Sequence, residues 1–225
     1  EKYIIVDEVS MLDTILMSSL LKGIKRDVKL ILVGDYFQLP SVSQGQVLKD
    51  LIDSAIIDVV KLNCLYRQNE NSYIPILAGE IRDKDLSDDF ICKRDDYNFL
   101  MCENEKVIPT ILYIVDNALK KGYTDHEVQV LAPMYKSING IDRLNKNLQK
   151  LLNPPSPKKN ELIYGDIIYR VGDKVLQLIN DTEANVYNGD IGYITDIIDS
   201  KKSESKKNEI IISYDGANVT YTPDK

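Results

Sequence analysis

Short apolar runs alternate with amphipathic stretches in the first part of the chain. Tyr3–Val6 is an uninterrupted apolar run and Lys29–Val33 is apolar after its first residue, as in strands buried on both faces of a parallel sheet. Apolar residues recur at helical spacing in Asp13–Ile24, and Gln46–Ile52 predicts a second, shorter helix. Val59–Leu62 predicts a third strand. This order of strands and helices is typical of an α/β domain.

The middle of the chain predicts helices on either side of an irregular segment. Helices are expected near residues 71–82 and 105–121, and residues 83–96 between them are acidic. Val128–Ala132 predicts another buried strand, and the apolar stripe of Ile138–Leu152 predicts an amphipathic helix. This part therefore continues the α/β pattern.

Beyond Leu152 the period of the apolar positions changes to two. A proline-rich linker at Pro154–Pro157 excludes helix. Asn188-Gly189 and Asp215-Gly216 are typical hairpin turns. Short strands are expected at 162–164, 174–179, 191–198, 209–214 and 218–222. Five short antiparallel strands predict a small β-barrel.

Charge and composition limit the function classes. The chain has 225 residues, 44% of them hydrophobic, and a formal net charge of −7, which by itself argues against a nucleic-acid partner. Residues 136–174 nevertheless carry an excess of Lys and Arg, and such a local field acts over a Debye length of about 8–10 Å. A basic half can therefore bind phosphates despite the acidic total.

Cysteine usage and hydropathy indicate the compartment. Cys64, Cys92 and Cys102 lie far apart, so neither a zinc site nor a disulfide framework is predicted. No run of about 18 apolar residues occurs, so no membrane association is predicted. A cytoplasmic location is expected, and His126, the only histidine, is expected at the surface.

Candidate chemistry lies where two predicted strands end. Asp7 and Glu8 follow the first strand, and Gly34 and Gln38 follow the second. The carboxyl ends of parallel strands form the crevice where α/β proteins bind ligands. Asp7 is suited to hold Mg²⁺, and Glu8 to orient or deprotonate a water. The simpler alternative is that Asp7-Glu8 only ends a strand.

These segments resemble motifs of superfamily 1 DNA helicases. Asp7-Glu8 with Ser10-Met11 is similar to motif II, and Gly34-Asp35 with Gln38-Leu39-Pro40 to motif III. Further segments resemble the RecD-like branch: Leu65–Gln68 (motif IV), Val130–Pro154 (motif IVa region) and Gly172–Gly192 (an SH3-like barrel inserted in the second motor domain). The resemblance covers nearly the whole chain.

The resemblance implies specific roles in ATP hydrolysis. Asp7 would bind Mg²⁺, Glu8 would position the hydrolytic water, and Gln38 would sense the γ-phosphate of ATP. Arg67, from the second motor domain, would act as an arginine finger, which is worth about 10³–10⁵ in rate. The alternative for Arg67 is an exposed cation at a strand end. Asp7, Glu8, Gln38 and Arg67 thus form the expected nucleotide site.

The expected DNA-binding residues come from two places. Pro133, Met134, Tyr135 and Lys136 are expected at a strand end, where Tyr135 would stack on bases of single-stranded DNA and Lys136 would contact phosphate. Pro133 and Met134 suit packing equally well. Lys174 and Asn188 are the candidates in the barrel, which can bind either DNA or protein.

The implied protein is an ATP-dependent helicase that moves 5′ to 3′ on single-stranded DNA in recombination or repair. It is similar to the α subunit of exodeoxyribonuclease V, whose other subunits are possible partners. The expected division is a partial RecA-like domain (1–60), part of a second RecA-like domain (61–160) and an SH3-like barrel (161–225). The alternatives are the helicase portion of a conjugative relaxase and a non-catalytic nucleic-acid- or protein-binding module.

The sequence also leads us to expect a piece of a larger motor. It contains no Gly-x-x-x-x-Gly-Lys-Ser/Thr loop and no counterpart of motifs V and VI, so the chain is expected to be inactive alone. In this family's sheet the strand Leu30–Val33 lies beside the phosphate-loop strand. An exposed edge at Leu30–Val33 is therefore expected to promote self-association.

Overall fold

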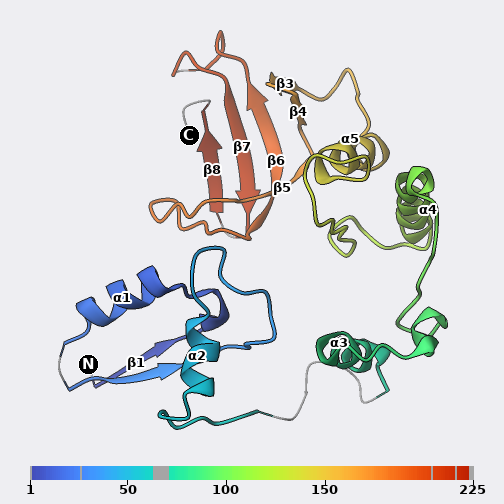
Figure 1. The fold of residues 1–225 in the computed structure, drawn as a ribbon. Coiled ribbons are helices and arrows are strands. Elements are labelled where there is room, and N and C mark those ends of the chain that lie inside the picture. The colour runs from blue at the N-terminus through green and yellow to red at the C-terminus, as the bar shows by residue number, and fades with distance from the viewer. Residues whose placement is uncertain (1, 26, 63–70, 204, 216, 223–225) are drawn as a thin grey trace. The chain divides into compact units, whose positions relative to one another are not determined.

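The computed structural model describes residues 2–25, 27–62, 71–203, 205–215 and 217–222. The chain forms two compact units, residues 1–100 and 101–225 (Figure 1). Each has its own helices and strands. The expected three-part division at residues 60 and 160 stays a prediction.

The first unit begins with a parallel βαβ arrangement. Strands β1 (Tyr3–Val6) and β2 (Lys29–Leu32) pair in parallel, with Val6 opposite Leu32. A 3₁₀ turn, η1 (Val9–Met11), and helix α1 (Thr14–Gly23) connect them. Helix α1 begins where it does because the Asp13 carboxylate accepts the N–H of Leu16 at 2.7 Å. Both predicted strands and the first helix are thus present.

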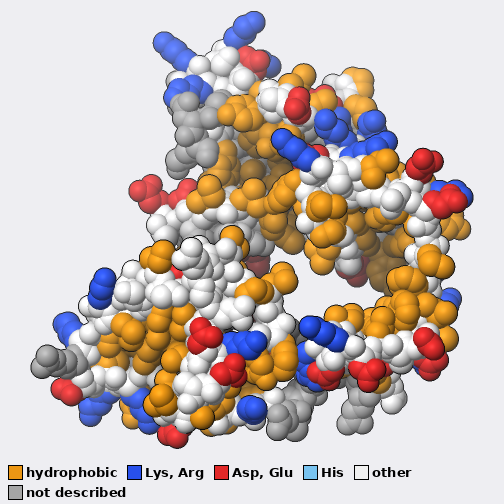
Figure 2. All heavy atoms as spheres, viewed as in Figure 1, with side chains coloured by type: hydrophobic (Ala, Val, Ile, Leu, Met, Phe, Trp, Pro, Cys, Tyr) orange, Lys and Arg blue, Asp and Glu red, His pale blue; other side chains and the backbone are white. Residues whose placement is uncertain are grey.

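Three more elements complete the first unit: α2 (Val47–Asp53), α3 (Tyr73–Asp83) and the 3₁₀ turn η2 (Asp88–Ile91). The start of α3 is held by Ser72, whose hydroxyl donates to Asp96 at 2.6 Å. Hydrogen bonding to Ser72 lowers the pKa of Asp96. Many apolar side chains of this unit lie on its surface, among them Tyr3, Ile5, Ile15, Leu39 and Val42 (Figure 2).

Two helices open the second unit. After the 3₁₀ turn η3 (Asn104–Lys106), helix α4 (Val107–Lys120) buries Ile108 and Val115, and α5 (Ile141–Leu152) buries Leu144. The two helices pack against each other. Helix α5 begins at Ile141 rather than at the expected Ile138, because residues 134–140 form a tight loop before it.

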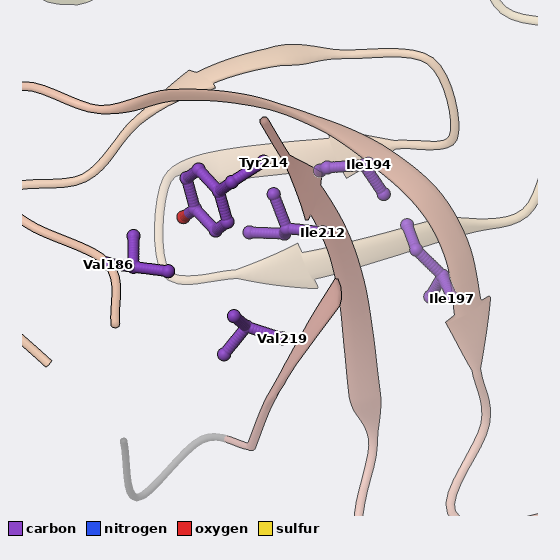
Figure 3. Packing of buried hydrophobic residues seen from close by; sticks show 6 residues of the cluster. All are labelled: Val186, Ile194, Ile197, Ile212, Tyr214 and Val219. Atoms are coloured by element: carbon purple, nitrogen blue, oxygen red, sulfur yellow. The ribbon is translucent and has the colours of Figure 1, made fainter. Parts of the chain in front are cut away.

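The rest of the second unit is antiparallel. Strands β3 (Glu161–Tyr164) and β4 (Ile167–Arg170) form a hairpin. A second sheet has the order β5-β6-β7-β8, with bounds Lys174–Leu176, Ile191–Ile198, Glu209–Tyr214 and Ala217–Tyr221. Its core contains side chains from β6, β7 and β8 and from the loop between β5 and β6. These residues are Val186, Ile194, Ile197, Ile212, Tyr214 and Val219 (Figure 3).

A buried polar network fastens α5 to this β-rich part. The Asp173 carboxylate accepts from Asn153 Nδ2 at 2.7 Å, Gln149 Nε2 at 2.6 Å and the Arg170 backbone N–H at 2.7 Å. Arg170 is 5% exposed and donates to Glu161 at 2.6 Å. Because every partner comes from the end of α5 or from β3–β5, the helix and the sheets form one body.

The structure corrects three of the expected strands. Neither Val59–Leu62 nor Val128–Ala132 is a strand, because neither forms a ladder of backbone hydrogen bonds with another described segment. β5 ends at Leu176 instead of continuing to residue 179. Strand β4 was not predicted. It follows a tight turn in which Gly165 has a φ of 58°.

Candidate nucleotide and nucleic-acid sites

Asp7 and Glu8 lie at the carboxyl end of β1. The backbone N–H of Glu8 donates to Asp7 Oδ1 at 2.9 Å, and both side chains are exposed. Glu8 has a φ of 53°, a left-handed conformation that is uncommon for a residue with a β-carbon. This conformation turns the chain from the strand into η1 and leaves both carboxylates at the sheet edge.

The end of β2 lies against the same edge. The Val33 N–H donates to the Val6 carbonyl at 2.8 Å, and the Val9 N–H donates to the Val33 carbonyl at 3.0 Å. A β-carbon on Gly34 would lie 3.0 Å from the Val9 nitrogen, so glycine allows this close approach. The structure therefore brings the Asp7-Glu8 and Gly34-Asp35 segments together, as the sequence predicts.

Gln38 is held in a tight turn directly after this contact. Asp35 accepts the Phe37 N–H with Oδ1 at 3.0 Å and the Gln38 N–H with its carbonyl at 3.1 Å. The Gln38 side chain is exposed. The loop then folds back, and its Gln44 carbonyl accepts the N–H of Thr14 at 3.1 Å. The amide thus lies on a loop braced at both ends.

Ser10 is a candidate that the sequence reasoning did not select. It lies in η1 with a residue exposure of 9%, and its hydroxyl has no hydrogen-bond partner among the described residues. Buried polar groups are normally paired, so such a group needs an explanation. The available signal was its place three positions after Asp7, within the segment that resembles motif II.

The oxygen atoms at this edge suit Mg²⁺. Asp7 keeps a second carboxylate oxygen besides the one that accepts from Glu8. Among the described residues no group of three or more His, Cys, Asp or Glu side chains is placed to hold a metal. Mg²⁺ keeps several waters and typically uses one or two carboxylates together with substrate phosphates, so the single carboxylate of Asp7 fits it.

Arg67 and the segment Leu65–Gln68 around it lie outside the described residues. The expected contribution of Arg67 to the nucleotide site therefore stays a prediction.

Pro133, Met134, Tyr135 and Lys136 lie in the loop before α5, not at a strand end as expected. The Ile141 N–H donates to the Met134 carbonyl at 2.9 Å, and a β-carbon on Gly140 would lie 2.2 Å from the Tyr135 carbonyl oxygen. All four side chains are exposed, with Tyr135 at 62%. The loop thus presents an aromatic ring and an ammonium group beside the N-terminus of α5.

Lys174 has a different setting from that expected. Its ammonium group donates to the carbonyls of Asp125 at 2.8 Å and Val128 at 3.2 Å, which fixes the loop after α4. In the same place the ring of His126 lies 4.4 Å from that of Tyr193, centroid to centroid. Burial raises the pKa of Tyr193 to about 12, with a smaller contribution from the charge of Asp125. This cluster ties the loop to β5 and β6.

Asn188 lies in the loop before β6 with an exposed side chain. Its backbone N–H donates to Asn180 Oδ1 at 2.8 Å. The structure does not place Asn188 and Lys174 in a shared contact, and their assignment to DNA binding stays a prediction.

Two family models match the chain. A model described as an AAA domain matches residues 1–101, and one described as the ATP-dependent RecD-like DNA helicase SH3 domain matches residues 144–214. The second match confirms the SH3-like barrel. It also begins within α5, in agreement with the polar network that joins this helix to the barrel.

Two curated relatives are also named as RecD proteins. The ATP-dependent RecD2 DNA helicase of Deinococcus radiodurans is 32% identical over 227 residues, which cover 97% of this chain and 28% of the relative. The RecBCD enzyme subunit RecD of Mycolicibacterium smegmatis is 28% identical over 205 residues, 85% of this chain and 36% of the relative. The chain therefore spans about a third of the length of these relatives.

Solved structures agree at the level of the fold. A Pif1 helicase from Bacteroides in complex with ADP-AlF3 and ssDNA has a TM-score of 0.53 at 20% identity, covering 98% of this chain and 52% of that one. A structure of two coordinating Pif1 helicases at forked dsDNA has a TM-score of 0.54 at 18% identity, covering 98% and 53%. These likenesses confirm the expected RecA-like α/β fold class. None of the described helices is long and apolar enough to cross a membrane.

Proposed function

The chain belongs to the RecD-like family of DNA helicases, and from this we propose that it forms part of an ATP-driven motor that moves along single-stranded DNA. The observation that carries the proposal is the single sheet edge that holds Asp7, Glu8 and the Gln38 loop. A hydrolytic site needs a metal ligand, a group that positions water and a group that responds to the γ-phosphate, and Asp7, Glu8 and Gln38 are our candidates for these three roles.

Each residue at this edge has a separate task in the proposed reaction. Asp7 would hold Mg²⁺, which would neutralise charge on the phosphates. Glu8 accepts a hydrogen bond from the attacking water and takes its proton. Gln38 reaches the nucleotide from its braced loop. Arg67 supplies positive charge for the transition state.

The DNA contacts are proposed for the loop before α5 and for the barrel. Tyr135 and Lys136 are consecutive exposed residues, and we propose that a base stacks on the ring while the ammonium group contacts phosphate. Pro133 and Met134 are exposed in the same loop, and Asn188 offers an exposed amide on the barrel. The direction of movement is proposed as 5′ to 3′.

Two kinds of protein partner belong to the proposal. One relative is a subunit of the RecBCD enzyme, so partner subunits of this kind are candidates. The other partner is a second copy of the chain, joined through the outer edge of β2.

The experiment is a Glu8→Gln change in the complete motor polypeptide. Removing the general base should lower DNA-stimulated kcat by about 100-fold or more. The nucleotide dissociation constant should not change, because the amide keeps the size of the side chain. Glu105→Gln removes the same charge from an exposed position in the second unit and is the matched control.

Two outcomes would reject the proposal or part of it. An unchanged kcat in Glu8→Gln would reject Glu8 as the group that positions the water. ATP hydrolysis by the isolated chain would contradict the expected need for a phosphate-binding loop, which its sequence does not contain.

A further inference from the structure

Phe37 is an exposed aromatic residue next to the proposed sensor Gln38. Its side chain is 54% exposed, and its ring lies 4.1 Å from that of Tyr36, centroid to centroid. The Phe37 N–H and the Gln38 N–H both donate to Asp35, at 3.0 and 3.1 Å. Because one residue holds both amides, the Phe37 ring and the Gln38 side chain belong to the same turn.

A guanidinium group from α3 covers this ring. The Arg82 Cζ lies 5.0 Å from the centroid of Phe37, within the range of a cation–π interaction. Asp83 holds the guanidinium in a forked arrangement, with Nε–Oδ1 at 2.7 Å and Nη2–Oδ2 at 2.9 Å. A planar group held at two atoms keeps one orientation beside the ring, which a lysine would not do.

The other end of α3 is anchored independently. Ser72 and the backbone N–H of Tyr73 both donate to the Asp96 carboxylate, and the Tyr73 side chain is 7% exposed. Helix α3 is therefore fixed at its start, and its last turn touches the Gln38 loop. In the sequence, α3 follows shortly after Arg67, the proposed arginine finger.

We propose that Arg82 is a positioning residue that couples the Gln38 loop to α3 through its contact with the Phe37 ring. This inference rests on the proposed function of the chain. When Gln38 engages nucleotide, Phe37 shifts with it, and the contact with Arg82 passes that shift to the helix that follows Arg67. Arg82 itself touches no reacting atom.

The chain offers a matched control for this contact. Arg94 lies over the ring of Tyr73 with its Cζ 4.7 Å from the centroid, which is the same type of interaction within the same unit. Arg94→Ala removes the same charge and the same kind of contact without touching the Gln38 loop. The test variants are Arg82→Ala, Phe37→Leu and their combination. Leucine keeps an apolar side chain but removes the ring face.

The first measurement is amide hydrogen exchange on the isolated chain, which needs no enzymatic activity. Losing an exposed cation–π contact should speed exchange at Phe37 and Gln38 by about two- to five-fold in Arg82→Ala. Arg94→Ala should leave both amides unchanged. Equal rates of amide exchange at Phe37 and Gln38 in wild type and Arg82→Ala would show that the contact with Arg82 does not stabilise the loop.

The second measurement is ATP turnover by the complete motor. Arg82→Ala and Phe37→Leu should each lower DNA-stimulated kcat by about two- to five-fold, with an unchanged nucleotide dissociation constant. The double variant should be no slower than either single variant, because both remove one contact. Additive losses of kcat in the double variant would contradict the proposed coupling. So would an unchanged kcat in Arg82→Ala together with faster amide exchange at Phe37 and Gln38.

The two measurements separate this inference from the proposed function. A wild-type motor without DNA-stimulated turnover would defeat the proposed function, whatever the exchange data show. A wild-type motor with normal turnover, in which Arg82→Ala behaves like Arg94→Ala, would leave the function standing and defeat only the role of Arg82.

Discussion

Glu8 and Ser10, which follow Asp7 closely in the chain, each carry a free-energy cost that packing does not explain. Glu8 adopts a left-handed backbone conformation with a φ of 53°, which for a residue with a β-carbon costs about 1 kcal/mol or more. Ser10 buries a hydroxyl without a hydrogen-bond partner among the described residues. Such costs persist where the surrounding structure enforces them, and they are common at functional sites. Their occurrence within one short segment supports the assignment of this sheet edge as the site.

Ser10→Ala should not destabilise the chain. Removing a buried hydroxyl that lacks a partner should raise the free energy of unfolding by up to about 1 kcal/mol. Ser19→Ala is the control, because the Ser19 hydroxyl is exposed and donates to the Ile15 carbonyl at 3.0 Å. Chemical denaturation followed by circular dichroism measures both. A loss of about 1 kcal/mol or more in Ser10→Ala would show that the hydroxyl has a partner in solution.

At the scale of elements, one carboxylate is the shared acceptor in the connection between α5 and the barrel. Asp173 accepts hydrogen bonds from Gln149, Asn153 and the Arg170 backbone. Asp173→Ala removes this shared acceptor from the buried network and should lower the free energy of unfolding by about 3 kcal/mol. Asp166→Ala, at the exposed tip of the β3–β4 hairpin, should change it by less than about 0.5 kcal/mol. Equal stabilities of the two variants would contradict the network.

Elements whose signal is local were predictable from the sequence. The Tyr3–Val6 and Lys29–Leu32 strands and the helix between them follow from apolar spacing and from a capping residue, Asp13. A strand also needs a neighbour, which an apolar run cannot reveal. For this reason Val59–Leu62 and Val128–Ala132 were predicted as strands and are not.

The candidate site was predictable to a similar degree. The meeting of Asp7-Glu8 with Gly34 at one edge follows from parallel strand ends, and the structure shows it. The burial of the Ser10 hydroxyl without a partner and the contact between Arg82 and Phe37 depend on tertiary packing, which the sequence does not show. The hydrogen bonds from Lys174 to two backbone carbonyls also depend on tertiary packing.

At the scale of the whole molecule, binding of single-stranded DNA should be weak and should depend strongly on salt. The formal net charge is −7, so attraction depends on local groups such as the exposed Lys136. Lys136→Ala should reduce the slope of log K against log salt by about 0.7, the value for one phosphate contact on a single strand. Lys121→Ala, an exposed lysine just after α4, is the control. Fluorescence anisotropy at several salt concentrations measures the slopes, and an equal slope for both variants would remove Lys136 from the DNA contacts.

The sheet of the first unit predicts how the isolated chain behaves in solution. β1 and β2 pair only with each other among the described strands, so the outer edge of β2 offers backbone donors and acceptors. The edge is also apolar, with Ile31 39% and Val33 41% exposed, and such edges pair with other chains.

We expect concentration-dependent association in sedimentation velocity. Ile31→Lys should suppress it, since a charge on an edge strand opposes pairing, whereas Ile163→Lys on the β3–β4 hairpin of the second unit should not. A chain that stays monomeric at high concentration, or one whose association responds equally to both substitutions, would show that the β2 edge is not the contact.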